Sequence, residues 1–543
     1  VGVWDAEKKD SVEKVLNDGV DGINLEDSLP APVENLEKSD IVQTSLDEEG
    51  WKKAGLTIVV VGASGDLAKK KTFPSLLNLY VDNLLPKDFI IHGYARSNLN
   101  HDELREKLKP FLEKTGHTPE SIDTFLSNCF YKRGNGYGDI ESFQDLGRNI
   151  DSFEKQYPHK LGHNRLFYLA IPPNVFAETG VAIKQTCMAG SGWTRVIVEK
   201  PFGRDLESCE ELLAILGKNF DEEQLYRIDH YLGKEMVQNL LVLRFGNLLF
   251  ERLWNRDNIK CVFLTFKEPF GTDGRGGYFD KYGIIRDIIQ NHLMQVLSIL
   301  AMEAPTKVDG IEAGESIRDA KVQVLKAIPP VELDECFLGQ YKGYSDDPSI
   351  QNKGTKTPTY AAIRCFVRNP RWEGVPFIFK AGKALDERKA EIRIQFKDSP
   401  ASEFLFDSFC PRNELVLRLQ PDEAIYFKTN VKSPGFSSQP VQSELEVNYS
   451  TRYFQNQSSH ANPDAYTRLI LDVLRGRSAA FVREDELRRS WEIFTPLLNE
   501  IESRKIKPVT YKSGSRGPPE ADAFIKKKSG YVRNENYKFP TMS

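Results

Sequence analysis

The sequence contains few of the residues that cross-link proteins or anchor them in membranes. Its 543 residues include seven cysteines, an odd number, and no two of them form a CxxC pair. A disulfide framework or a zinc site is therefore not expected, and a reducing compartment is the default. The longest mainly apolar run, residues 293–302, is about half the length of a membrane span. With a net charge of −5, nothing in the composition attracts nucleic acid.

Several catalytic motifs are absent as well. There is no HExxH, GxSxG or P-loop, which argues against zinc proteases, serine hydrolases and P-loop NTPases. The sequence opens with VGVWDAEKKD, which lacks the apolar stretch of a signal peptide, so we expect a cytoplasmic protein. Hydrophobic residues make up 40% and charged residues 28%, the balance of a globular protein with a large core.

Charge is concentrated at the two ends of the chain. Residues 1–50 carry 14 acidic and four basic side chains with little periodicity, which predicts a disordered acidic extension. Residues 504–538 carry ten basic and three acidic side chains, with tyrosines between them. This basic segment is either a surface edge or a pocket for a polyanionic ligand.

Hydrophobic patterning predicts two kinds of sheet. Apolar, β-branched runs at 56–63, 88–96, 164–173 and 194–203 alternate with helical patterns, as expected for βαβ units and a parallel sheet. Further along the chain, short alternating strands follow one another, which favours an antiparallel sheet with one covered face. A long amphipathic helix over 283–302 could cover that face. The expected fold class is therefore α/β followed by α+β.

The first predicted strand runs directly into a glycine-rich turn, GASGDLA (62–68). Its GxxGxxA spacing is a variant of the dinucleotide-binding fingerprint, in the required context of strand, turn and helix. Gly62 permits the turn, Gly65 lets the backbone approach a pyrophosphate, and Ala68 allows the helix to pack on the strand. The alternative interpretation is a tight strand–helix turn without a ligand.

The end of the second predicted strand indicates which nucleotide binds. An NAD enzyme usually has Asp or Glu there to accept from the ribose 2′-hydroxyl. Here Arg96 and Ser97 occupy the position. A cation and a hydroxyl suit a 2′-phosphate, and Lys71 could add charge, so NADP is favoured over NAD. Taken alone, Arg96 could also be a surface arginine.

The densest polar cluster, RIDHYLGKE (227–235), lies where the two patterns meet. If residues 230–240 are helical, His230 and Lys234 share one face and could bind a phosphate together. Lys200, at the end of the preceding strand, is expected at the same edge of the sheet. The alternative is a salt-bridged surface pair.

A second candidate lies within the long helix. His292 is either a histidine satisfied in the core or a general base, since histidine titrates near neutral pH. A neighbouring carboxylate would hold its tautomer and stabilise its imidazolium, and Asp229 or Asp287 could serve.

Six segments together resemble one enzyme family. They are GASGDLAKKK (62–71), EKPFG (199–203), RIDHYLGKE (227–235), FKEPFGTDGRGGYFD (266–280), IRDIIQNHL (285–293) and KAGKALDERKAEIRIQF (380–396). In this order they closely resemble glucose-6-phosphate dehydrogenases. The resemblance implies a Rossmann-like NADP-binding domain at 51–228, then an α+β domain at 229–543 that binds substrate and forms oligomers. It also implies oxidation of glucose 6-phosphate at C1 to the lactone, with NADPH as the other product, as the first step of the oxidative pentose phosphate pathway.

The resemblance also implies roles for individual residues. His292 is similar to the general base, and Asp229 to the carboxylate that orients it. The positions similar to substrate contacts are Lys200, His230, Tyr231, Lys234, Glu268, Asp287, Lys383 and Arg388. The positions similar to cofactor contacts are Gly62, Ser64, Gly65, Asp66, Leu67, Arg96 and Lys200, to which the charge argument adds Lys71.

Some members of this family form dimers or tetramers and bind a second, structural NADP near the subunit interface. The positions that could match that site are Lys389, Arg393, Arg412 and Arg516. Two alternatives stay open. One is an oxidoreductase of the same architecture that acts on another sugar phosphate or on a free hexose. The other is a catalytically silent NADPH sensor or scaffold, against which the intact catalytic motifs argue.

Overall fold

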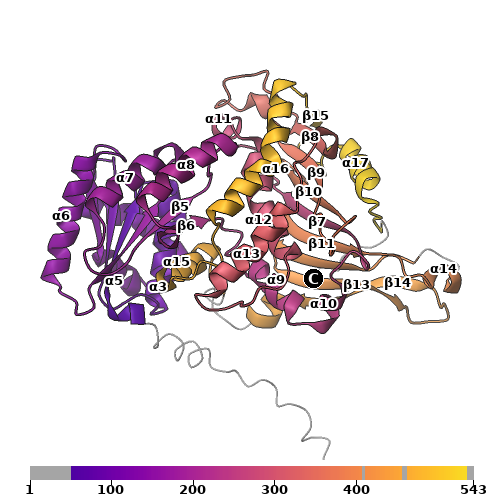
Figure 1. Ribbon diagram of the computed structural model, residues 1–543, viewed down its shortest axis with the longest axis horizontal. Helices are drawn as coiled ribbons and strands as arrows, with labels where there is room; N and C mark the ends of the chain where they lie inside the picture. The colour runs from indigo at the N-terminus through magenta and orange to yellow at the C-terminus, as the bar shows by residue number, and fades with distance from the viewer. Residues whose placement is uncertain (1–49, 407–409, 455–461, 535–543) are drawn as a thin grey trace, which may run out of the picture. The chain divides into compact units, whose positions relative to one another are not determined.

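A computed structural model of the chain describes residues 50–406, 410–454 and 462–534 (Figure 1). The predicted acidic extension, apart from Gly50, lies outside the described residues. Among these residues, no helix is long and apolar enough to cross a membrane.

The first sheet has six parallel strands in the order β3-β2-β1-β4-β5-β6. This is the doubly wound order of dinucleotide-binding folds, with β1 at the centre. The strands are β1 (Gly55–Val61), β2 (Phe89–Ala95), β3 (Cys129–Arg133), β4 (His163–Leu169), β5 (Thr194–Glu199) and β6 (Leu225–Ile228). The four strands predicted from the sequence are confirmed as β1, β2, β4 and β5.

Strand β1 shows why the apolar runs form this sheet. All seven of its residues are buried, and it pairs with β2 on one side and β4 on the other. A central parallel strand is covered on both faces, so it needs continuous apolar sequence rather than alternation. The accompanying helices are η3 (Ala68–Thr72), α3 (Phe73–Val81), α4 (His101–Leu112), η4 (Glu113–Thr115), α5 (Pro119–Ser127), α6 (Ile140–Gln156), η5 (Pro173–Val175), α7 (Phe176–Thr186), α8 (Leu206–Asn219) and η6 (Glu222–Gln224).

The second sheet has nine strands in the order β14-β13-β12-β11-β7-β10-β9-β8-β15. Neighbours are antiparallel except for two parallel pairs, β7 with β10 and β8 with β15. The expectation of a large, mostly antiparallel sheet is therefore confirmed. Its strands are β7 (Ile259–Lys267), β8 (Cys336–Tyr341), β9 (Tyr360–Phe366), β10 (Pro376–Gly382), β11 (Lys389–Phe396), β12 (Glu414–Gln420), β13 (Ala424–Lys432), β14 (Pro440–Asn448) and β15 (Val509–Tyr511).

Helices cover one face of this sheet (Figure 1). The predicted long helix over 283–302 is present as two consecutive pieces, the π-helix η7 (Ile285–Leu293) and α12 (Met294–Ala301), and η7 packs on β7 and β10. The other helices are η2 (Gly50–Lys53), α9 (Glu235–Phe245), α10 (Leu248–Leu253), α11 (Gly276–Phe279), α13 (Ala313–Lys326), η8 (Leu333–Glu335), η9 (Tyr344–Asp346), α14 (Ser402–Leu405), η10 (Ser450–Phe454), α15 (Ala465–Arg475), α16 (Glu484–Ser503) and α17 (Pro519–Ser529).

Helix α15 connects the two halves of the fold. Although it follows β14 of the second sheet in the sequence, it packs against α3, the helix that follows the glycine-rich turn. The carboxyl ends of β5 and β6 therefore lie close to elements from both halves, and the polar cluster of the sequence is located there.

Candidate active site

The turn after β1 has the shape of a dinucleotide cradle. Gly62 has φ +89°, and a Cβ atom at this position would lie 2.3 Å from the carbonyl oxygen of Ala170. The amide of Gly65 donates to the carbonyl of Gly62 at 2.9 Å, which closes the turn. Ala68 is fully buried where the following helix packs. Only glycine fits at Gly62, because its φ is positive and the Ala170 carbonyl occupies the place of a side chain.

The loops after β1 and β2 lie next to each other. The hydroxyls of Ser64 and Ser97 are 2.9 Å apart, which brings Arg96 to the same edge of the sheet. The Arg96 guanidinium lies 5.1 Å from the ring centroid of Tyr137 and is exposed. The cradle therefore carries a cation where a 2′-phosphate would lie, and these residues fit NADP.

The other residues predicted to contact the cofactor are Asp66, Leu67 and Lys71, and each already has contacts within the protein. Asp66 forms ion pairs with Lys69 and Lys70 at 3.4 and 2.9 Å, and Leu67 packs against the core. Lys71 forms an ion pair with Asp464 at 2.8 Å, immediately before α15.

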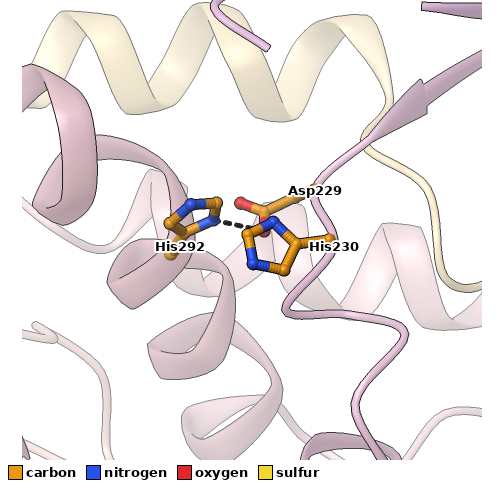
Figure 2. A group of neighbouring side chains, drawn as sticks. All are labelled: Asp229, His230 and His292. Atoms are coloured by element: carbon orange, nitrogen blue, oxygen red, sulfur yellow. Dashed lines mark hydrogen bonds and ion pairs between the residues drawn. The ribbon is translucent and has the colours of Figure 1, made fainter. Parts of the chain in front are cut away.

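A buried histidine–aspartate pair lies at the end of β6 (Figure 2). Nδ1 of His292, on η7, lies 2.5 Å from Oδ1 of Asp229, and each residue is 2% exposed. The same Asp229 oxygen accepts from the amide of Tyr231 at 3.0 Å. Of the two carboxylates that the sequence offered as partners for His292, the structure selects Asp229.

Aromatic rings enclose the pair. The Tyr231 ring stacks on His292 with centroids 4.6 Å apart, and the His230 ring lies 4.7 Å from His292 at a steep angle. Asp229, His230 and His292 each offer one polar atom within 4.8 Å of the others. Because the short hydrogen bond engages Nδ1 of His292, Nε2 is the nitrogen left for proton transfer, which favours acid–base chemistry over a metal centre.

Burial and nearby charges set the protonation states of the pair. Burial lowers the pKa of His292 and outweighs the opposing effect of the Asp229 carboxylate, while Lys200 lowers it further. Burial acts to raise the pKa of Asp229, but His292, His230 and the Tyr231 amide lower it to about 2. At neutral pH the pair is therefore a carboxylate and a neutral imidazole, the state that a general base requires.

Four charged side chains converge beside the pair. Lys200 donates from Nζ to the backbone oxygen of Asp287 at 2.8 Å and to its Oδ1 at 3.2 Å. Lys383 forms ion pairs with Glu268 and, at 3.7 Å, with Asp287. These residues come from four separate elements, and their alternating charges offer donors and acceptors to a polyhydroxyl ligand.

The helix considered over 230–240 is present only from Glu235 onward. Residues 230–234 form turns, and α9 begins at Glu235 with Lys234 as its N-cap in an extended conformation. The amides of Leu232, Gly233 and Lys234 donate to the carbonyls three residues earlier, as in turns. His230 and Lys234 therefore do not share a helix face.

Instead, Lys234 lies among charges of both signs. Its Nζ is 5.1 Å from the Tyr231 ring centroid. Burial lowers the pKa of Lys234, the carboxylates of Glu423 and Asp464 oppose this, and the cations of Arg388 and Lys71 lower it further. The exposed Arg388 precedes β11. Mutually repelling cations held close together are the usual setting for an anionic ligand such as a phosphate.

Three of the four basic residues considered for a second NADP have acidic partners. Arg393 pairs with Glu391 and Glu414 at 3.1 and 2.7 Å. Lys389 pairs with Glu387 at 2.9 Å, Arg412 pairs with Asp398 at 2.7 Å, and Arg516 is exposed.

Sequence reasoning missed three polar residues at this site. Tyr466, on α15, stacks on His230 with centroids 5.8 Å apart. Glu199 and Tyr168 form a buried hydrogen bond of 2.6 Å beside Lys200. Glu199 directly precedes Lys200 in a motif already noted, and a buried acid next to a functional lysine was the available signal.

Comparisons with known proteins show which family this chain belongs to. The family model for the glucose-6-phosphate dehydrogenase NAD binding domain matches residues 59–239, and the model for the C-terminal domain matches residues 241–536. A relative from Arabidopsis thaliana, the cytoplasmic glucose-6-phosphate 1-dehydrogenase 6, is 52% identical over 489 residues, or 89% of this chain and 93% of the relative. A relative from Takifugu rubripes, a glucose-6-phosphate 1-dehydrogenase, is 50% identical over 91% of this chain and 92% of its own.

Solved structures show the same likeness. A glucose-6-phosphate dehydrogenase in complex with its substrate glucose-6-phosphate is 45% identical, with a TM-score of 0.82 over 89% of this chain and 99% of that one. A glucose-6-phosphate 1-dehydrogenase from Mycobacterium avium is 31% identical, with a TM-score of 0.76 over 90% of this chain and 99% of that one.

A dinucleotide cradle beside a buried histidine–aspartate base defines a nicotinamide-dependent oxidoreductase. The family models and relatives then specify which one. The chain belongs to the glucose-6-phosphate dehydrogenase family, as the motif resemblance predicted.

Proposed function

We propose that this chain oxidises glucose 6-phosphate at C1 to the 6-phosphoglucono-lactone and reduces NADP to NADPH, with His292 as the general base. This reaction is the first step of the oxidative pentose phosphate pathway. The observation that carries the base assignment is the 2.5 Å hydrogen bond that Nδ1 of His292 donates to the Asp229 carboxylate, which leaves Nε2 to accept the proton of the reacting hydroxyl.

The chain's own residues handle the proton. As the hydride leaves C1, Nε2 of His292 takes the proton of the C1 hydroxyl, and Asp229 stabilises the imidazolium that forms. Bound NADP supplies the hydride acceptor. The Tyr231 ring stacked on His292 holds the imidazole plane in place, so little reorganisation is needed during the reaction.

The remaining residues bind the sugar and its phosphate. The proposed contacts to sugar hydroxyls are Lys200, Glu268, Asp287 and Lys383. The proposed contacts to the phosphate are His230, Tyr231, Lys234 and Arg388. A phosphate at the far end of the sugar is a remote anchor, and its binding energy can orient C1 at the base.

For the cofactor, we propose NADP in preference to NAD. Arg96 stands where an NAD enzyme usually has an acidic residue, and the residues at the end of β2 supply no carboxylate that would repel a 2′-phosphate. The division into domains at 228/229 is supported by the end of the last parallel strand, β6, at Ile228.

A second, structural NADP is proposed at Lys389, Arg393, Arg412 and Arg516. Binding there would exchange the present acidic partners of the first three for phosphate oxygens. Because Arg516 is exposed, we propose that it makes the first contact with this second NADP.

We further propose that the chain forms homodimers or homotetramers in the cytoplasm. Strand β14 is the edge of the second sheet and exposes Val441, Leu445 and Val447 by 43%, 68% and 43%. An apolar sheet edge of this kind favours self-association. The relatives from Arabidopsis thaliana and Solanum tuberosum that are named as cytoplasmic support the location.

The test is NADPH formation by the purified protein, with NADP and NAD in parallel. Glucose 6-phosphate, free glucose and a second hexose phosphate are the substrates to compare. The proposal predicts rapid NADPH formation with glucose 6-phosphate and much less with the others. Activity with only another sugar would mean that glucose 6-phosphate is the wrong substrate. Cofactor binding without activity on any of them would favour the sensor or scaffold alternative.

A further inference from the structure

The buried carboxyl of Glu199 has no role in the reaction described so far. Glu199 is the last residue of β5 and is 6% exposed. Its Oε1 accepts from the hydroxyl of Tyr168, which is itself 1% exposed, at 2.6 Å. A carboxyl is costly to bury, so a site that keeps one beside the catalytic pair calls for an explanation.

The strand register explains why these groups meet. Tyr168 pairs with Ile197, and side chains two apart on a strand share a face, so Tyr168 and Glu199 lie on the same side of the sheet. Glu199 in turn pairs with Ile228, the residue before Asp229. Glu199 therefore lies opposite the residue that precedes the catalytic carboxylate, on the neighbouring strand.

The groups that face Glu199 are few and come from every neighbouring element. They are Tyr168 on β4, Lys200 on its own segment, Asp229 after β6, and Tyr466 on α15. Burial raises the pKa of Glu199 to about 7, with Asp229 raising it and Tyr168 and Lys200 opposing. The charge of Glu199 therefore changes within the neutral pH range.

We propose that Glu199 is a positioning residue for the proton transfer, whose negative charge offsets Lys200 and stabilises the imidazolium that forms on His292. Lys200 opposes protonation of His292, because its cation lies nearby. An ionised Glu199 next to Lys200 reduces that opposition. Glu199 exchanges no proton with the substrate: the C1 hydroxyl proton still goes to His292, and the hydride to NADP.

This inference rests on the proposed role of His292, and it predicts a particular pH signature. Well below the pKa of about 7, Glu199 is protonated and contributes nothing. Well above it, Glu199 is ionised and supports the base. Replacing it with a neutral amide of the same shape should therefore reduce turnover only at the higher pH.

The experiment compares kcat of the wild type and Glu199→Gln across the pH range, with glucose 6-phosphate and its C1-deuterated form. The deuterated substrate identifies conditions in which hydride transfer limits the rate. We expect the kcat of the variant to equal that of the wild type at the acid end of the pH range. At the alkaline end we expect it to be about three- to tenfold lower, which is roughly the effect of one charge that is not in direct contact with the imidazolium. A deficit of the same size at every pH, or none at any pH, would overturn the proposal.

A second variant protects the test against misfolding of the first. Tyr168→Phe removes the hydroxyl that stabilises the ionised Glu199, so the pH at which Glu199 acts should move upward. An unshifted profile would count against the proposal. Asp472→Asn is the matched control, because Asp472 is a partly buried acid on α15 with a pKa of about 6, raised by burial, and the profile should not change.

Failure of this inference is distinguishable from failure of the proposed function. If His292→Asn keeps normal turnover, the base assignment itself is wrong. If His292→Asn is inactive while Glu199→Gln shows no pH-dependent deficit in kcat, the base assignment holds and only the proposed role of Glu199 is wrong.

Discussion

Replacing Asp229 with asparagine tests the electrostatic core of the site. The substitution keeps the size of the side chain and its hydrogen bond from the Tyr231 amide. It removes the negative charge that faces His292 at 2.5 Å. Because the asparagine amide can donate as well as accept, the imidazole is also free to adopt the wrong tautomer.

The expected magnitude follows from the burial of the pair. Both residues are 2% exposed, so bulk water screens their interaction weakly. Two opposite charges about 4 Å apart interact by about 4 kcal/mol at an effective dielectric constant of about 20. The charge on His292 exists only after the hydroxyl proton has moved, so the whole of this energy is lost from the transition state. At about 1.4 kcal/mol per factor of ten, turnover should fall by about a thousandfold.

The assay is steady-state NADPH formation, which gives kcat and KM for glucose 6-phosphate. We expect KM to change much less than kcat, because Asp229 stabilises a charge that the ground state lacks. Asp472→Asn, which changes a partly buried acid outside the site, is the control and should keep normal turnover. A loss smaller than tenfold, or a loss mainly in KM, would refute the reasoning.

Three other substitutions test separate parts of the account. Lys234→Ala removes a phosphate cation and should raise KM for glucose 6-phosphate about ten- to hundredfold with a smaller effect on kcat; an unchanged KM contradicts the phosphate role. Arg96→Ala should lower the NADP-to-NAD preference in kcat/KM by about ten- to hundredfold, and a constant ratio means that another residue recognises the 2′-phosphate. Gly62→Ala places a Cβ 2.3 Å from the Ala170 oxygen at φ +89°, so thermal unfolding should show a loss of about 1–3 kcal/mol, together with weaker NADP binding. Gly190→Ala, which has open space around it, is the control and should change neither.

The sequence predicted the fold well where apolar patterning is strong. The central strands β1, β2, β4 and β5 were expected because each is a long buried run. In the six-stranded sheet, the strands β3 and β6 were missed. Both are short, and their sequences CFYKR and LYRI include charged residues. Both lie at the edges of the sheet, where fewer apolar positions are needed.

The composition of the site was predictable, but its pairings were not. The sequence offered two partners for His292, and nothing local could choose between Asp229 and Asp287, which are 63 and five residues away. Tertiary structure decides, because Asp287 is engaged by Lys200. The contact of Lys71 with Asp464 spans 393 residues and depends on the return of α15 to α3. The helix considered over 230–240 begins only at Glu235, because residues 230–234 form i, i+3 turns that the sequence pattern did not indicate.

The most direct test of the account is the turnover of His292→Asn. The variant should fold, bind NADP, and bind glucose 6-phosphate with an affinity close to that of the wild type, since the phosphate residues are untouched. With Nε2 gone, the C1 hydroxyl proton has no acceptor, so kcat should fall by about two to four orders of magnitude. Near-normal turnover by a folded variant that binds both ligands would contradict the central claim that His292 is the general base.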